Sequence, residues 1–279
     1  MSTLTLTKHH GLGNDFLVVF HPHVDDLPAL ARQVCDRRRG IGADGMLVGE
    51  SEDGYAARMV LFNADGSRAE MSGNGIRCFA QALAARRGDM VPQRILTDAG
   101  ERCVTLSTTD DEHTIHASVD MGMIEPIAEP AEWDQLGCHP DRPVMHLSLG
   151  NPHSVVGVED VMAIDLLSLG LKIPQVNLEV VAPGQHQDEV RMRVHERGAG
   201  ITEACGTGAC AAAYAAARWG LATPRDGKLV VEMDGGSATV TLDSPTPGRA
   251  TLTGPATYIG TVEVTVDVTV EQAQFDEIA

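Results

Sequence analysis

Aromatic residues are scarce in this sequence, making up 4% of its 279 residues, with only 2 tryptophans. Basic residues are also in the minority: 21 lysines and arginines stand against 39 aspartates and glutamates, a formal net charge of −18. Such a charge argues against nucleic acid or an anionic membrane surface as the main partner, and we expect neither. No apolar run approaches the roughly 20 residues that a membrane-spanning helix needs.

Signals for secretion, disulfide bonding and metal binding are missing as well. The N-terminus lacks a basic segment followed by an apolar core, so we expect a cytoplasmic protein. The 6 cysteines are too few for a disulfide framework in a chain of this length, and no Cys-x-x-Cys occurs. Because the histidines also lack His-Glu-x-x-His spacing, we expect no dedicated metal site.

The patterns that are present are mainly those of β-strands. Helical spacing occurs at residues 27–38 and 165–171, and two alanine-rich helices are predicted at 76–87 and 209–219. Separate strands are expected at 249–254 and 258–270. This order predicts an α+β protein of two similar domains, each a mostly antiparallel, barrel-like sheet around a central helix. We place the N-terminal domain at residues 1–120, rejoined by a C-terminal strand at 264–279, and the C-terminal domain at 121–263.

The most informative stretch places a thiol at the start of the second alanine-rich helix. Cys205 is followed by Gly206 and Gly208, which allow a tight turn with bare backbone. Near the positive end of a helix dipole the pKa of a thiol is expected to fall, which favours the thiolate that acts as a base. The same backbone amides suit a carboxylate. The alternative interpretation is a buried structural cysteine in a glycine turn.

A second copy of this stretch occurs in the first half of the chain. Residues 70–88 and 203–220 both carry Gly-x-Gly followed by an alanine-rich helix that ends near arginine and glycine. The repeat predicts duplicated halves whose helix N-termini face each other across a cleft. Ser72 stands where the matching thiol would be. Cys78, further along that helix, is expected to face the core.

Polar residues in the loops suit a small zwitterionic ligand. Glu196 and backbone carbonyls suit ammonium groups, while Arg197, side-chain amides and helix N-termini suit carboxylates. The alternative for Arg197 is a surface ion pair. His153 either holds a proton or orients a base, or it is a structural histidine. The neutral hydrogen-bonding candidates are Asn14, Asn63, Asn74, Asn151 and Asn177.

The combination resembles the diaminopimelate epimerase family over nearly the whole chain. The resemblance rests on motifs at residues 11–15, 39–45, 63–67, 73–78, 150–153, 176–177, 195–198 and 204–208. It implies two pseudo-symmetric domains, a homodimer, and no cofactor or metal. It also implies that two cysteines on opposite faces of the α-carbon interconvert LL- and meso-diaminopimelate, in the pathway to lysine and peptidoglycan precursors.

The resemblance also assigns individual roles. Cys205 matches the second catalytic cysteine, and His153 and Glu196 would tune the thiols. The implied substrate contacts are the side chains of Asn14, Asn63, Asn151, Asn177, Glu196 and Arg197 and the backbone of Gly73, Asn74, Gly206 and Thr207.

One position departs from the family pattern: Ser72 replaces the first catalytic cysteine. A serine hydroxyl is a much weaker acid than a thiol and a poor resting base near neutral pH, so we predict that epimerisation is slow or depends more on one direction, with Cys205 as the competent base. Two alternatives stay open. One is another cofactor-free amino-acid racemase or dehydratase on the same scaffold, and the other is a non-catalytic amino-acid-binding relative.

Overall fold

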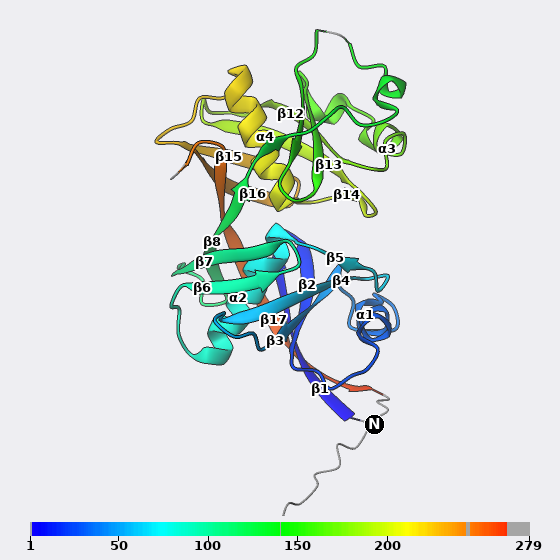
Figure 1. The fold of residues 1–279 in the computed structure, drawn as a ribbon, viewed down its shortest axis with the longest axis vertical. Helices are drawn as coiled ribbons and strands as arrows, with labels where there is room; N and C mark the ends of the chain where they lie inside the picture. Colours follow the sequence, from blue (N-terminus) through cyan, green and yellow to red (C-terminus); the bar gives the residue numbers. More distant parts are fainter. Residues whose placement is uncertain (1, 140, 244–245, 267–279) are drawn as a thin grey trace, which may run out of the picture.

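The computed structural model describes residues 2–139, 141–243 and 246–266. Its elements form two lobes, and one long strand, β17 (Arg249–Val266), runs through both (Figure 1). Helix α2 (Gly73–Arg87) lies in the first lobe and α4 (Gly206–Trp219) in the second. The architecture is the strand-rich α+β fold that the sequence predicts.

The first lobe is a closed barrel. Its strands follow the chain order except at the seam, where β17 pairs with both β8 and β1 and closes the ring. The β2/β3 and β4/β6 pairs are parallel and the other pairs are antiparallel. The strands are β1 (Ser2–Gly11), β2 (Asn14–Phe20), β3 (Gly45–Glu50), β4 (Ala57–Asn63), β6 (Gln93–Thr97), β7 (Gly100–Thr108) and β8 (Thr114–Met123), with the short β5 (Arg68–Ala69) beside β4.

The second lobe repeats this plan. It closes through β17, which pairs with β16, and through β9, which follows β8 and pairs with β10. Here β11/β12 and β13/β15 are the parallel pairs. The strands are β9 (Glu125–Pro126), β10 (Val144–Ser148), β11 (Pro152–Gly157), β12 (Asn177–Pro183), β13 (Glu189–Glu196), β15 (Lys228–Met233) and β16 (Gly236–Leu242), with β14 (Gly200–Thr202) paired to β13.

Each barrel is filled by its central helix. The small side chains of α4 are buried almost throughout, which lets the sheet pack closely around the helix. Both helices end at a glycine in the left-handed conformation, Gly88 with φ 75° and Gly220 with φ 72°. They begin at Gly73 and Gly206, three residues earlier than the sequence predicts. This makes Ser72 and Cys205 the N-cap residues, whose side chains accept from the backbone N–H of Gly75 and Gly208.

The remaining helices are short and lie outside the barrels. Helix α1 (Leu27–Cys35) packs on β3 and β4, and its apolar face forms a separate core with them. It ends before residue 38, where we predicted its end, because the Asp36 carboxylate accepts from the backbone N–H groups of Arg38 and Arg39. The others are α3 (Leu166–Gly170) and the 3-10 turns η1 (Trp133–Leu136) and η2 (Val161–Ala163).

The strands near the end of the chain differ from the predicted ones. The two strands expected at 249–254 and 258–270 are one strand, β17, that continues through Pro255 opposite His116 of β8. Of the predicted terminal strand 264–279, residues 264–266 pair with 2–4 of β1, and residues 267–279 lie outside the described part of the chain. Within the described residues, the helices are all too short or too polar to cross a membrane.

Candidate active site

The N-termini of α2 and α4 meet between the two barrels (Figure 1). A Cβ atom added to Gly73 would lie 2.9 Å from Gly206 Cα, and one added to Gly206 would lie 2.8 Å from Gly73 Cα. Real Cβ atoms do not approach so closely, so this meeting of the backbones requires glycine on both sides. The prediction that the two helix starts face each other is confirmed.

A cavity of about 980 Å³ surrounds this meeting point and is lined by both halves of the chain. Nearly all of the predicted site residues line it, and His153 is the exception because it is fully buried behind the wall. The predicted residues in the lining are Asn14, Asn63, Ser72, Gly73, Asn74, Asn151, Asn177, Glu196, Arg197, Cys205, Gly206 and Thr207.

On the α4 side, Cys205 is 4% exposed, and its Sγ accepts from the Gly208 N–H at 3.4 Å. Burial raises the pKa of this thiol well above its ordinary value, and the nearby Glu196 and Glu179 carboxyls raise it further. Hydrogen bonds from Thr207 and Gly208 oppose this increase without overcoming it. The expectation of a lowered thiol pKa is therefore wrong, because burial and two carboxyls outweigh the helix N-terminus.

A chain of hydrogen-bonded side chains runs from the buried Glu179 to Thr207, which lies next to Cys205. The Glu179 carboxyl lies 2.6 Å from His153 Nδ1, and His153 Nε2 lies 3.0 Å from Asn151 Oδ1. Asn151 Nδ2 then donates to Thr207 Oγ1 at 3.2 Å. With Asn151 Oδ1 as acceptor, His153 Nε2 carries a proton. Through this chain His153 orients Asn151 and Thr207, two residues of the cavity.

Glu179 is a site residue that sequence reasoning missed. It is fully buried, and burial raises the pKa of its carboxyl, although the His153 ring lowers it in part. Its second oxygen, Oε2, has no hydrogen-bond partner among the described residues. The signal in the sequence was a single carboxylate within the otherwise apolar residues 178–183 of strand β12.

Glu196 lines the cavity beside Cys205. Burial raises the pKa of its carboxyl, while hydrogen bonds with Thr202 and Cys205 lower it in part. The neighbouring Arg197 is exposed, and its backbone N–H donates to Asn177 Oδ1 at 2.9 Å. Asn177 Nδ2 donates to the Pro152 carbonyl at 3.0 Å, which fixes the amide at the wall of the cavity.

On the α2 side the capping group is a hydroxyl. Ser72 Oγ accepts from the Gly75 N–H at 3.0 Å, the same bond that Cys205 makes with Gly208. Cys78 does not replace the missing thiol, because its side chain is fully buried in the core as predicted. Burial raises the pKa of Cys78 to about 12.

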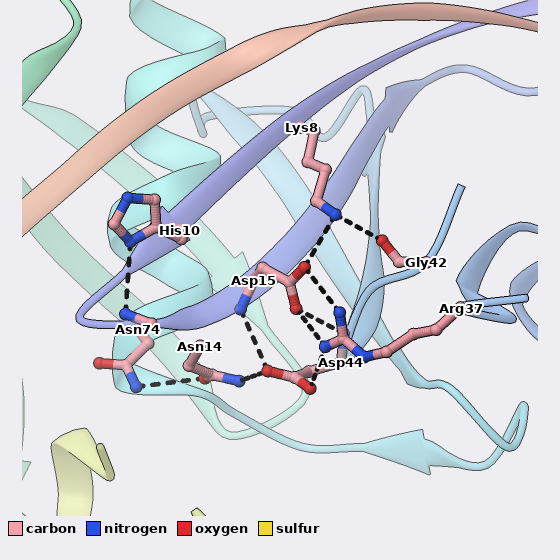
Figure 2. A network of polar contacts seen from close by, with 9 residues as sticks. Lys8, His10, Asn14, Asp15, Arg37, Gly42, Asp44 and Asn74 are labelled. Atoms are coloured by element: carbon pink, nitrogen blue, oxygen red, sulfur yellow. Dashed lines mark hydrogen bonds and ion pairs between the residues drawn. The ribbon is translucent and has the colours of Figure 1, made fainter. Parts of the chain in front are cut away.

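A row of polar contacts reaches from the helix start to the surface (Figure 2). Asn74 Nδ2 donates to Asn14 Oδ1 at 3.1 Å, and Asn14 Nδ2 donates to Asp44 at 2.7 Å. Arg37 bridges Asp44 and Asp15 at 2.8 and 2.7 Å. Asp44 thus orients the Asn14 amide.

Asp44 was not predicted as a site residue, although it lies in the glycine-rich motif at residues 39–45. Its partner Asp15 is held by two cations. Burial alone would raise the pKa of Asp15, but bonds with Arg37 and Lys8 keep it below its ordinary value. Asn63, which pairs with Gly45 next to Asp44, donates to Ser67 Oγ at 3.0 Å.

Two barrels around glycine-started helices that meet at one cavity define a fold that solved epimerases and isomerases share. A predicted epimerase from Pseudomonas aeruginosa superposes with a TM-score of 0.74 at 15% identity, over 95% of this chain and 100% of that one. A hydroxyproline epimerase from Agrobacterium vitis superposes with a TM-score of 0.66 at 15% identity, over 96% and 94% of the two chains. At such identities the likeness shows the fold alone.

Sequence comparison is more specific. The family model described as diaminopimelate epimerase matches residues 6–126 and 145–259. The diaminopimelate epimerase of Thermosynechococcus vestitus is 40% identical over 91% of this chain and 96% of its own. That of Acidiphilium cryptum is 37% identical over 90% and 93%. The chain belongs to the diaminopimelate epimerase family.

Proposed function

We propose that this chain interconverts LL- and meso-diaminopimelate by moving the α-proton, in the supply of lysine and peptidoglycan precursors. One observation supports the proposal within the family: two helix N-termini converge on one cavity, and their N-cap side chains, Cys205 and Ser72, both line it. This is the arrangement that proton transfer on opposite faces of one carbon requires.

The reacting carboxylate binds between the two helix starts. The backbone N–H groups near Gly73, Asn74, Gly206 and Thr207 point along both helix dipoles toward it. The α-ammonium group lies beside Glu196. The distal end of the substrate reaches Asn63, Asn177 and Arg197, which line the same cavity.

Proton removal starts at Cys205. The ammonium group beside Glu196 offsets the carboxyl charge that opposes ionisation of the thiol, so the thiolate forms when substrate is bound. The thiolate takes the α-proton, and the electron pair of the C–H bond moves into the carboxylate. The two helix N-termini stabilise the added negative charge.

Ser72 then completes the inversion. Its hydroxyl gives a proton to the opposite face of the carbanion and recovers one from water, while the Cys205 thiol loses its proton to solvent. In the reverse direction the hydroxyl must act as the base, for which it is poorly suited. The rate constants of epimerisation in the two directions are linked by the equilibrium constant. The difference between Cys205 and Ser72 as bases therefore appears in the rates of α-hydrogen exchange. The isomer whose α-hydrogen faces Cys205 exchanges faster.

The test is α-hydrogen exchange in deuterated water on LL- and meso-diaminopimelate, with the stereochemical outcome followed in parallel, for this chain and for Ser72→Cys. We expect exchange of one isomer with slow inversion in the starting chain, and a gain in inversion for Ser72→Cys of about tenfold or more. Tight binding without exchange in either form would instead support a non-catalytic amino-acid-binding protein. Preferred turnover of a shorter amino acid would support another racemase or a dehydratase.

Further properties implied by the family belong to this proposal. We infer a cytoplasmic homodimer that works without cofactor or metal, with domains at residues 1–120 and 121–263 and with the end of the chain rejoining the first. Strands β8 and β17 contribute to both barrels, which supports a division into two similar halves that share a seam. Light scattering of the purified chain tests the dimer.

A further inference from the structure

Arg77 lies in the first turns of α2, and its side chain is fully buried. All three groups of its guanidinium donate to neutral oxygens: Nε to the Pro255 carbonyl at 3.2 Å, Nη1 to the Gly73 carbonyl at 3.2 Å, and Nη2 to Asn74 Oδ1 at 2.8 Å. Within the part of the chain that the structure describes, no carboxylate pairs with it.

A buried cation without an anionic partner is costly, and folded proteins rarely keep one. Burial lowers the pKa of Arg77 to about 10, so the side chain still carries its charge near neutral pH. The fold therefore holds an uncompensated positive charge just behind the start of α2. An anion bound at that start would compensate it.

The contacts of Arg77 lead directly to the carboxylate position proposed above. The Gly73 carbonyl that accepts from Nη1 belongs to the peptide unit whose N–H is that of Asn74. A charged hydrogen bond to the carbonyl of a peptide polarises the unit and makes its N–H a stronger donor. The guanidinium thus acts on the site through one peptide, without touching the ligand.

Arg77 also holds the side chain that joins the two halves of the site. Nη2 fixes Asn74 Oδ1, so that Asn74 Nδ2 points away from it and donates to the Ala204 carbonyl at 2.9 Å. Ala204 immediately precedes Cys205. The start of α2 is in this way linked to the loop that carries the thiol.

The other helix has no such cation. Counted from the N-cap, Arg77 stands at the same position in α2 as Cys210 does in α4, five residues after Ser72 and Cys205. Cys210 is fully buried and lies close enough to Arg77 for their charges to interact. One guanidinium, that of Arg77, therefore provides the positive charge near the point where both helices meet.

We propose that Arg77 is a positioning residue that provides the permanent positive charge for the reacting carboxylate, acting through the Gly73–Asn74 peptide. This inference rests on the proposed function. The charge on the carboxylate grows when the α-proton leaves, so the contribution of Arg77 is larger in the transition state than in the substrate complex.

The first experiment compares Arg77→Gln and Arg77→Lys with Arg87→Gln, which removes the same charge from the exposed end of α2. Exchange of the α-hydrogen is measured, with kcat and KM separated, on whichever of LL- and meso-diaminopimelate exchanges faster in the starting chain. We expect kcat to fall about 10-fold to 100-fold in Arg77→Gln with a smaller rise in KM, partial recovery in Arg77→Lys, and no change in Arg87→Gln. An unchanged kcat in folded Arg77→Gln overturns the inference.

A second pair of variants leaves Arg77 in place and covers the case in which Arg77→Gln does not fold. Cys210→Asp places a carboxyl near the guanidinium, and Cys210→Asn is its uncharged control of the same shape. We expect kcat to be about tenfold lower in Cys210→Asp than in Cys210→Asn, and the melting temperature of Cys210→Asp to be no lower than that of Cys210→Asn. Equal kcat values in the two variants would contradict a role for the charge of Arg77.

These outcomes separate the inference from the function on which it rests. If the starting chain neither binds nor exchanges diaminopimelate, the proposed function fails and the role of Arg77 fails with it. If the starting chain exchanges the α-hydrogen and the charge variants match their controls, only the role of Arg77 is overturned.

Discussion

The starts of α2 and α4 have the same backbone and opposite electrostatic surroundings. In both, the N-cap side chain accepts from the N–H three residues on, and a glycine follows that touches the glycine of the other helix. Around Cys205, however, stand two carboxyls, Glu179 and Glu196, whereas the start of α2 is backed by the guanidinium of Arg77.

Duplicated halves can therefore keep one backbone geometry while their surroundings favour different chemistry. Burial and the two carboxyls raise the pKa of the Cys205 thiol, which makes its thiolate a stronger base once it forms. The cation on the α2 side favours the negative charge that proton removal creates. In our proposal the two-fold backbone therefore carries one half that supplies the base and one half that stabilises negative charge.

The largest effect is expected when the difference between the two caps is removed. Cys205→Ser makes both N-caps serine and keeps the capping hydrogen bond, so the fold should hold. Without a thiol near the α-carbon, we expect α-hydrogen exchange to fall about 1,000-fold or more, within the usual range for loss of a general base. Exchange rates and melting temperatures of the variant and the starting chain check this.

Cys138→Ser is the matched control, because Cys138 is a partly exposed cysteine that does not line the cavity. It should exchange at the rate of the starting chain. Retained exchange in Cys205→Ser would mean that the α2 half supplies the base, and the comparison would have to be reversed.

The sequence was sufficient for the features that depend on local chemistry. The glycines after Ser72 and Cys205, and the alanine runs that follow, indicated both helix starts and their pairing. The Asn, Glu and Arg candidates were found because they carry polar groups in or beside the loops and turns of the predicted pattern. Those residues line the common cavity in the structure.

Features that depend on contacts between distant segments were missed. Glu179 meets His153 only because β11 and β12 pair in parallel, and Asp44 meets Asn14 only because β2 and β3 do. The pKa of Cys205 was predicted in the wrong direction for the same reason. The helix start is local to the thiol, but its effect is opposed by burial between the two halves of the chain and by two carboxyls from β12 and β13.

An intermediate effect is expected from the contact that the two halves share. Gly73→Ala and Gly206→Ala each place a Cβ within 3 Å of the opposite backbone, at 2.9 and 2.8 Å, so the helix starts must move apart. We expect exchange to fall about 10-fold to 100-fold in both variants, because small displacements of reacting groups are costly. Alanine is the better helix former, so stability need not fall in parallel.

Gly260→Ala is the control for this pair, since no atom lies within 4 Å of its added Cβ. Similar losses of exchange in Gly73→Ala and Gly206→Ala would show that the reaction depends equally on both helix starts. A loss in one variant alone would show that the carboxylate depends mainly on that helix.

The smallest effect concerns the electrostatics of the α4 half. Burial raises the pKa of Cys205 most, and Glu196 is the charge that adds most to the increase. Glu196→Gln removes that charge, so the thiolate should appear at lower pH. We expect the pH profile of Cys205 alkylation by iodoacetamide, followed by mass spectrometry, to move down by about one unit.

Alkylation needs no substrate, so a loss of ammonium binding at Glu196 does not disturb the measurement. Glu203→Gln is the control, because Glu203 is an exposed carboxyl of the same cavity and is not among the groups that shift the pKa of the thiol most. Its profile should match that of the starting chain. A move of the Glu196→Gln profile to higher pH would show that Glu196 takes the proton of the thiol and so promotes its ionisation. The α4 half would then be a carboxylate and thiol couple, in which Glu196 activates Cys205 instead of opposing it.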